Sequence, residues 1–221
     1  MGQDSISTVM DADGNVYQTV KIGNQIWTVE NLRTTRYNDG SAIPLVTDGN
    51  KWAALTTPGY CFYGNTSDVD CIKEYGALYN WYAVDTKKLA PAGWHVPSNG
   101  EWIALEEYLI ANGYNWDDTS AENKIAKSLA AKTGWAESTT EGAIGNDLTR
   151  NNKSGFSALP GGCRSYSGYF GPIGGYGSWW NVSEYDASIA FGRLLVCDYV
   201  FLLRSNYYKS CGFSVRLLRD N

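Results

Sequence analysis

The sequence predicts an α+β fold with hairpins first, two amphipathic helices in the middle, and loops with short strands at the end. Three observations lead to this prediction. The runs VYQTVKI and QIWTV are rich in β-forming residues, HVPSNGEWIALEEYLIANG carries a helix-capping signature, and the last third mixes glycine, serine and aromatic residues without a helical period. A chain of 221 residues, 43% of them hydrophobic, is long enough for one substantial core, so we expect a single domain over residues 1–221.

The N-terminal part, residues 13–60, is expected to form antiparallel hairpins. Its two β-rich runs are separated by Gly23 and Asn24, a dipeptide typical of tight hairpin turns. Residues 11–15, DADGN, resemble the opening of a calcium loop, but the glycine is misplaced and no acidic twelfth ligand follows. We therefore interpret this stretch as a turn before the first strand.

Two helices are predicted, over about residues 98–112 and 120–133. Ser98 and Glu101 have the spacing of a capping box, and the first helix then carries one apolar face formed by Trp102, Leu105 and Leu109. The second helix is expected to stop at Gly134 and to carry a stripe of Ile125, Ala126, Leu129 and Ala130. Both helices should pack against a sheet.

The loop-rich region, residues 155–221, is where we expect a ligand to bind. Its first part, FSALPGGCRSYSGYFGPIGGYGSWW, is interpreted as irregular loop with short strands. In the closing FSVRLL, the apolar Phe213, Val215 and Leu217 alternate with Ser214 and Arg216. This alternation predicts a half-buried final strand.

Composition excludes several classes of function. A formal net charge of −5 argues against nucleic acid as the main partner, because phosphate binding requires a basic face. No window of about twenty apolar residues is present, so we expect no membrane insertion by this domain. The opening residues lack a signal peptide, and we expect that a leader or upstream domain of the native protein is absent from this chain.

The cysteines leave two alternatives open. Cys61 and Cys71 enclose a short polar loop, and they would form a disulfide or remain reduced depending on whether the protein is exported. The other three cysteines leave an odd count, and no CxxC spacing occurs anywhere in the chain. We therefore expect no metal site and no cofactor.

Five phrases together resemble a known bacterial family: IGNQIWTVENLRTTRYNDG, YGALYNWYAV, APAGWHVPSNGEW, GFSALPGG and KSCGFSVRLLRD. They resemble the Fibrobacter succinogenes major paralogous domain, from about Asp13 to the C-terminus. The resemblance implies a C-type-lectin-like fold in the branch related to formylglycine-generating enzymes, with two helices, a small sheet and a long loop region before a final strand. It also implies an exported protein on the bacterial cell surface. The family's final strand often reads SVRC, and Leu217 in place of that cysteine removes one disulfide.

A narrower resemblance concerns the segment from 191 to 211, which is similar to the variable part of proteins diversified by retroelements. Those elements mutate adenines in AAY codons, which never yield Trp, Met, Lys, Gln or Glu. The resemblance implies a fixed frame, expected at Ala190, Arg193, Leu195, Asp198, Tyr199, Leu202, Arg204, Lys209 and residues 212–216. The fourteen freely variable positions, all of permitted types, are then Phe191, Gly192, Leu194, Val196, Cys197, Val200, Phe201, Leu203, Ser205, Asn206, Tyr207, Tyr208, Ser210 and Cys211.

A physical consideration supports an outward orientation of these side chains. An inward-facing set would need a regular period and matched volumes, which this segment lacks. An outward-facing set tolerates almost any residue and forms an exposed apolar patch of the kind that marks binding sites. The alternative is that the segment forms ordinary core strands.

We expect the loop from 163 to 178 to extend the same ligand-binding surface. Its candidate contact residues are Cys163, Tyr166, Tyr169, Phe170 and Tyr176. Tyrosine supplies a large contact area at low entropic cost, as in antibody loops. The expected partner is a protein or glycan on another cell or host surface, bound by a domain of a larger surface protein or pilus-like assembly.

Enzymatic chemistry is not expected. The related oxidases use copper and a cysteine pair, and Cys197 with Cys211 does not provide one. His95 is the only histidine, and a ring bonded to backbone is its expected role. Glu106 and Glu107 face different ways on a helix, and an ion pair is expected for the acidic residues of SEYDAS with Arg193 or Arg204.

Two competing functions remain open. One is a carbohydrate-binding module of fixed specificity, which would use Trp179, Trp180 and neighbouring tyrosines without the calcium motifs of animal lectins. The other is a structural cell-surface module with no ligand.

Overall fold

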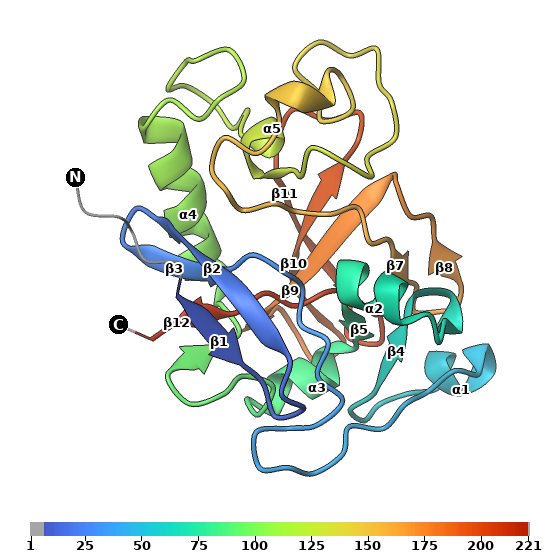
Figure 1. Ribbon diagram of the computed structural model, residues 1–221. Helices are drawn as coiled ribbons and strands as arrows, with labels where there is room; N and C mark the ends of the chain where they lie inside the picture. The colour runs from blue at the N-terminus through green and yellow to red at the C-terminus, as the bar shows by residue number, and fades with distance from the viewer. Residues whose placement is uncertain (1–6, 221) are drawn as a thin grey trace.

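The computed structural model describes residues 7–220 and contains a five-stranded antiparallel sheet at one side of the molecule (Figure 1). Its strand order is β1 (Thr8–Met10), β2 (Val16–Ile22), β3 (Gln25–Thr28), β12 (Leu218–Arg219) and β6 (Trp94–His95). The predicted hairpin at Gly23 is confirmed, because β2 and β3 pair across it. The last strand thus lies between the N-terminal hairpin and a strand from the middle of the chain.

The turn before β2 is also confirmed. The Asp11 carboxylate accepts hydrogen bonds from the backbone N–H groups of Asp13 and Asn15, each at 2.9 Å, and from the Tyr17 hydroxyl at 2.5 Å. This pattern is an Asx turn, in which a side chain takes the place of a backbone acceptor. Burial, reinforced by the hydrogen bond to Asp11, raises the pKa of Tyr17 well above its usual value.

A second antiparallel sheet has the order β11 (Leu203–Tyr208), β10 (Ile189–Val196), β9 (Tyr176–Glu184). Two short pairs flank it, β4 (Tyr60–Phe62) with β5 (Ala77–Tyr79), and β7 (Cys163–Arg164) with β8 (Phe170–Gly171). Short helices connect these pieces: α1 (Gly49–Ala53), α2 (Val69–Tyr75), α3 (Trp81–Asp85), and the 3₁₀ turns η1 (Tyr63–Asn65) and η2 (Leu148–Arg150). Mixed helix and antiparallel sheet confirm the α+β class.

Of the two predicted helices, one is confirmed. α4 (Asn99–Ala111) begins after Ser98, and the capping box with Glu101 is complete in both directions. Trp102, Leu105 and Leu109 are buried, as their spacing predicted.

The predicted helix over 120–133 is wrong in extent, because only α5 (Ala126–Leu129) is helical. The backbone before it is held by other partners: Lys124 N–H donates to the Asn115 side chain, and Ala126 N–H donates to the Val200 carbonyl. The expected apolar stripe is nevertheless buried, since Ile125, Ala126, Leu129 and Ala130 are all 0% exposed.

The segment 213–217 is not the half-buried strand that its alternation predicted, because both of its faces are buried. The Arg216 side chain is 1% exposed; its Nη1 donates to the carbonyls of Thr28 at 2.8 Å and Phe156 at 2.9 Å, and its Nε donates to the Asn31 side chain. A guanidinium with several donors can be buried where backbone carbonyls converge on it. Arg216 therefore ties the C-terminal segment to both the N-terminal hairpin and the loop at 156.

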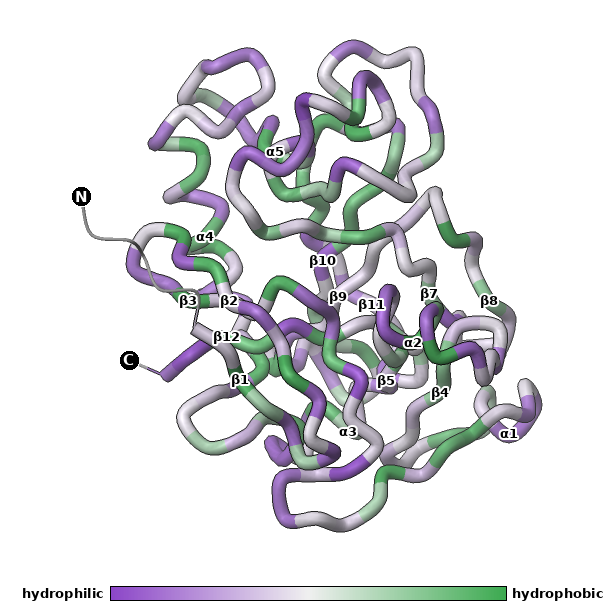
Figure 2. Tube along the Cα trace, viewed as in Figure 1, coloured by the Kyte–Doolittle hydropathy of each residue, from purple (hydrophilic) through white to green (hydrophobic). Residues whose placement is uncertain are grey.

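The described residues form three buried apolar clusters. The two larger ones gather around Tyr79, Trp180 and Phe213 and around Trp27, Trp102 and Phe156, and a small third cluster consists of Trp52, Cys61 and Leu78. Hydrophobic and hydrophilic residues alternate along the trace in short runs (Figure 2). No helix between residues 7 and 220 is long and apolar enough to cross a membrane.

The five cysteines, all within the described part of the chain, are free thiols. Cys61 is fully buried on β4, and burial raises the pKa of its thiol to about 11. Cys71 lies on α2 and is partly exposed. The structure therefore corresponds to the reduced alternative.

Candidate ligand-binding surface

The sheet β9–β10–β11 is fixed to the body of the protein through buried charged side chains. Arg193, at the centre of β10, is 0% exposed; its Nε lies 2.6 Å from Oε1 of Glu106, and its Nη1 donates to Asn99 at 3.0 Å. Burial raises the pKa of Glu106, although the Arg193 charge acts in the opposite direction. At the end of β11, the Lys209 ammonium contacts the Glu184 carboxylate and lies 4.7 Å from the Trp81 ring centroid.

The expected ion pairs of the SEYDAS stretch are therefore wrong in their partners. Glu184 pairs with Lys209, and Asp186 accepts from Ser188 in the turn between β9 and β10. Arg193 is already held by Glu106 from α4.

The loop between β10 and β11, residues 197–202, is held by backbone groups of the central part of the chain. The Cys197 carbonyl accepts from Gly145 N–H at 2.8 Å, and the Val200 carbonyl accepts from Ala126 N–H at 3.1 Å. The Leu202 backbone donates to and accepts from the Asn123 side chain. Because these bonds use the loop's main chain, the loop's path depends little on the side chains that it carries.

Most positions expected in the frame are buried. The buried frame positions are Ala190, Arg193, Leu195, Leu202, Lys209 and residues 212–216. Asp198, Tyr199 and Arg204 are exposed instead, so their assignment to the frame is wrong. They lie in the loop and on the edge strand, where a side chain has no facing element to pack against.

The predicted contact residues fall into three groups. Four are exposed: Tyr166, Tyr169, Asn206 and Tyr208. Ten are half-buried: Cys163, Phe191, Leu194, Val196, Val200, Phe201, Leu203, Ser205, Tyr207 and Ser210. Three are buried: Gly192, Cys197 and Cys211.

The prediction that Gly192, Cys197 and Cys211 are exposed contact residues is wrong, because all three are buried. A Cβ at Gly192 would lie 3.1 Å from the Tyr207 ring and 3.2 Å from the Trp179 carbonyl, so this position cannot vary freely. Cys211 is 6% exposed within the core cluster, and burial raises the pKa of its thiol to about 12. Cys197 is 9% exposed and packs against the cluster around Trp27. Their spacing gave no sign of this, because the partners come from distant segments.

Tyr207 is a borderline case. Its ring packs edge-on against Phe213 at 4.9 Å and against Trp180 at 6.4 Å between centroids, so one side of it belongs to the core. Tyr208, the next residue, points to the other face of β11 and is 53% exposed.

Tyrosine exposure differs sharply between the two parts of the chain. Of the nine tyrosines before residue 155, only Tyr108 is exposed. Of the seven after it, six are exposed: Tyr166, Tyr169, Tyr176, Tyr185, Tyr199 and Tyr208. The C-terminal third therefore places its tyrosines at the surface, whereas all but one of the earlier tyrosines are buried or half-buried.

A contiguous part of this surface, here called the tyrosine edge, lies on one face of the β10–β11 pair. The Tyr166 and Tyr208 rings are 4.8 Å apart, Tyr185 packs edge-on against Phe191 at 5.3 Å, and the Arg204 guanidinium lies 6.0 Å over the Phe191 ring. Register places Asn206 opposite Phe191 and Tyr208 opposite Ile189. The tyrosine edge consists of Tyr166, Tyr185, Phe191, Arg204, Asn206 and Tyr208.

Tyr185 and Tyr199 are exposed, although neither was predicted as a contact residue. Tyr185 lies in the turn between β9 and β10, and Tyr199 stacks on Phe201 at 4.9 Å in the loop after β10. A tyrosine beside a polar turn, as in SEYDAS, is the sequence signal that would have indicated Tyr185.

The loop residues Phe170 and Tyr176 lie elsewhere on the flank. Phe170 on β8 is half-buried, with the Arg164 guanidinium 4.9 Å over its ring, while Tyr176 at the start of β9 is 38% exposed. Phe170 is thus mainly a packing residue, and only Tyr176 adds exposed aromatic area.

Trp179 and Trp180 cannot form a sugar-stacking site. They are 1% and 0% exposed, and their indole N–H groups donate to Asn31 and to the Tyr79 carbonyl. The alternative carbohydrate site is therefore wrong as far as it uses these two residues, since a stacked sugar needs an open ring face.

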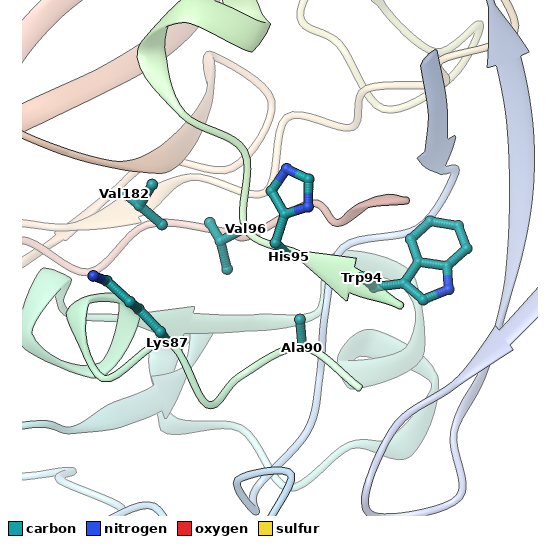
Figure 3. Close-up of a pocket in the computed structure, with 6 residues that line it drawn as sticks. All are labelled: Lys87, Ala90, Trp94, His95, Val96 and Val182. Carbon is teal, nitrogen blue, oxygen red and sulfur yellow. The ribbon is translucent and has the colours of Figure 1, made fainter. Parts of the chain in front are cut away.

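A separate pocket of about 180 Å³ is lined by Lys87, Ala90, Trp94, His95, Val96 and Val182 (Figure 3). The expectation for His95 is wrong in detail, because its ring is bonded to side chains. Nε2 lies 2.8 Å from Glu101 Oε1, and Nδ1 lies 2.5 Å from Asp220 Oδ1. Burial lowers the pKa of His95, but these hydrogen bonds outweigh it and raise the pKa above its usual value. With both nitrogens engaged, the ring serves as a link between α4 and the C-terminal residues.

Residues 7–220 contain no group of three or more His, Cys, Asp or Glu side chains arranged to hold a metal ion. The Glu106 carboxylate is paired with Arg193, whereas the next residue, Glu107, is exposed.

The fold and this surface define an α+β domain in which a buried frame carries exposed aromatic side chains. The family model described as the Fibrobacter succinogenes major domain matches residues 20–219, and the chain belongs to this family. No curated protein and no solved structure matches the chain.

Proposed function

We propose that this protein is a non-enzymatic ligand-binding domain of a bacterial surface protein, an adhesin-like module with a C-type-lectin-like fold. Its ligand surface is the tyrosine edge together with the half-buried residues of β10, β11 and their loop. The ligand is a protein or glycan on another cell or host surface. The family resemblance supports the exported location and the attachment to a larger surface protein or pilus-like assembly.

The observation that carries this proposal is the distribution of tyrosines. Six of seven are exposed after residue 155 and one of nine before it. Burying tyrosine is favourable in a core, so a cluster of exposed tyrosines on a rigid frame has no stabilising purpose of its own. Rigid aromatic side chains on fixed loops are the usual anchors of protein-binding surfaces.

The C-type-lectin-like assignment is supported by the order of elements. N-terminal hairpins come first and α4 follows, and a long loop region leads to β12, which returns to pair with β3.

We further propose that a retroelement diversifies the segment. The support is that eleven of the fourteen expected positions are exposed or half-buried, while most of the positions expected in the frame are buried. Gly192, Cys197 and Cys211 are removed from the set. Codons at the eleven remaining positions should end in pyrimidines; a majority ending in purines would exclude this origin.

Binding by the surface is tested with two probe collections, a glycan array and a display library of random peptides. A variant with Tyr166→Ala and Tyr208→Ala is compared with Tyr108→Ala, which removes an exposed tyrosine from α4. We expect the double variant to lose binding at least about tenfold while Tyr108→Ala binds like wild type, because aromatic hot spots contribute about 2 kcal/mol or more. Equal binding by all three proteins would refute the proposed surface.

A further inference from the structure

The outer edge of β11 has unpaired backbone groups. In an antiparallel pair, residues whose N–H and C=O face the partner alternate with residues whose groups face away. Lys209 N–H donates to Ser188 O, so the backbone groups of Lys209 face β10. By the alternation, the backbone groups of Tyr207, Ser205 and Leu203 also face β10. Arg204 and Asn206 therefore direct their N–H and C=O groups away from the sheet, and no hydrogen bond within residues 7–220 reaches those groups.

Both ends of this open stretch are closed. At one end the Asn123 amide accepts from Leu202 N–H at 3.2 Å and donates to Leu202 O at 3.0 Å, as a neighbouring strand would. At the other end Tyr208 O accepts from Cys211 N–H at 2.8 Å. The open groups are thus limited to Arg204, Asn206 and the Tyr208 N–H.

The opposite edge of the same sheet is covered. Along β9, Trp180 N–H donates to Ser214 O at 3.1 Å, and Val182 N–H donates to Pro97 O at 3.0 Å. The sheet is therefore open on the side that carries the tyrosine edge and closed on the other.

The residues with open backbone groups also carry exposed side chains of the tyrosine edge. Arg204, Asn206 and Tyr208 alternate along β11, so their side chains share one face. In the described part of the chain the Arg204 guanidinium has no carboxylate within 4.0 Å. An added strand would lie beside both the backbone groups and these side chains.

We propose that the β11 edge binds an extended segment of a protein partner, of roughly five residues, by strand addition. A carboxylate of the segment lies opposite Arg204, and an apolar side chain contacts Tyr166 and Tyr208. This inference rests on the proposed function, and it identifies the partner as a polypeptide.

Two features select this occupant. Free N–H and C=O groups at strand spacing match the backbone of another strand, whereas a sugar does not repeat donors and acceptors at this interval. A second copy of this chain would bring another Arg204 to the edge and supplies no carboxylate there.

The test uses proline as an edge-specific change. Asn206→Pro removes an outward N–H without removing a β10 hydrogen bond, since prolines are tolerated at sheet edges. Asn206→Ala is the matched control, because it removes the side chain and keeps the N–H. The probe is a fluorescent peptide selected from the random-peptide library on the wild-type protein.

We expect Asn206→Pro to bind the peptide at least about fivefold more weakly than Asn206→Ala, with equal melting temperatures, since one hydrogen bond and close approach are lost. Hydrogen exchange on the wild-type protein gives an independent readout that does not depend on the variant folding. Bound peptide should slow exchange of the Arg204 and Asn206 amides.

The experiments distinguish a failure of strand addition at β11 from a failure of the proposed ligand surface as a whole. If peptide binding is lost in the Tyr166→Ala, Tyr208→Ala variant but Asn206→Pro and Asn206→Ala bind equally, strand addition is wrong and the surface stands. If only glycans bind, the polypeptide partner is likewise wrong. If light scattering shows a wild-type dimer that Asn206→Pro dissociates, the occupant is a second copy and the inference is overturned.

Discussion

Nε of Arg193 lies 2.6 Å from Oε1 of Glu106, and this buried ion pair joins the centre of β10 to α4. Arg193 is directly opposite Arg204 across the β10–β11 pair, yet Arg193 is buried and Arg204 is exposed. Two arginines that face each other across one strand pair thus mark the boundary between the buried frame and the proposed ligand surface.

Arg193→Leu should lower the free energy of unfolding by about 3–5 kcal/mol, because it leaves Glu106 charged, mostly buried and unpaired. Arg204→Leu should change it by no more than about 0.5 kcal/mol. Urea unfolding of both variants measures the difference. Equal effects would mean that Arg193 is not part of a buried frame.

Local signals in the sequence were sufficient for some elements. The capping box at Ser98 and the turn at Gly23 each depend on residues a few positions apart, and both elements form as predicted. The stripe at Ile125 is buried as expected, although its helix is short. Where one segment contains its own hydrogen-bond partners, its sequence determines its structure.

Distant partners explain most of the errors. Ser214 and Arg216 are polar in the alternating pattern, but Arg216 donates to the carbonyls of Thr28 and Phe156, so burial of this face depends on segments far away. His95 likewise meets Asp220 across 125 positions. For the proposed ligand surface, the permitted residue types at 191–211 do not distinguish exposed from buried positions, and only the three-dimensional packing separates Gly192 from its neighbours.

Gly192 should not tolerate a side chain. Gly192→Ala places a Cβ 3.1 Å from the Tyr207 ring, and we expect it to destabilise the protein by about 1–3 kcal/mol through overpacking. Asn206→Ala, on the exposed edge, should be nearly neutral. A display library that randomises the eleven retained positions should keep a larger folded fraction than one that randomises Gly192, Cys197 and Cys211. A protease-resistance screen compares the two, and the reverse order would contradict the frame.

Lys127 should be required for the loop at 144–151. Its buried ammonium lies within hydrogen-bonding distance of the carbonyls of Ile144, Asn146 and Asp147 and of the Asn151 side chain, which share its three N–H donors. Burial lowers the pKa of Lys127. Lys127→Met leaves several buried acceptors without a donor, so we expect a loss of about 2 kcal/mol or more and faster proteolysis of this loop. Lys132→Met, at an exposed lysine, is the control, and equal resistance of both variants would refute the role.

The last prediction concerns pH and rests on His95, the single histidine of the chain. Hydrogen bonds to Asp220 and Glu101 outweigh burial and raise its pKa above the ordinary 6.5. The protonated ring is therefore favoured in the folded state, and its stabilising contribution is complete below 6.5 and disappears as pH rises through the raised pKa.

The free energy of unfolding of the wild-type protein should consequently fall as pH rises above about 6.5. His95→Gln should remove this fall, because no other side chain has its ordinary pKa near neutral pH. Urea unfolding at several pH values measures both proteins. Asp220→Asn should reduce the dependence of the free energy of unfolding on pH without abolishing it, since Glu101 still favours the charged ring. A slope that is identical in wild type and His95→Gln would show that the ring does not link α4 to the C-terminal residues through its charge.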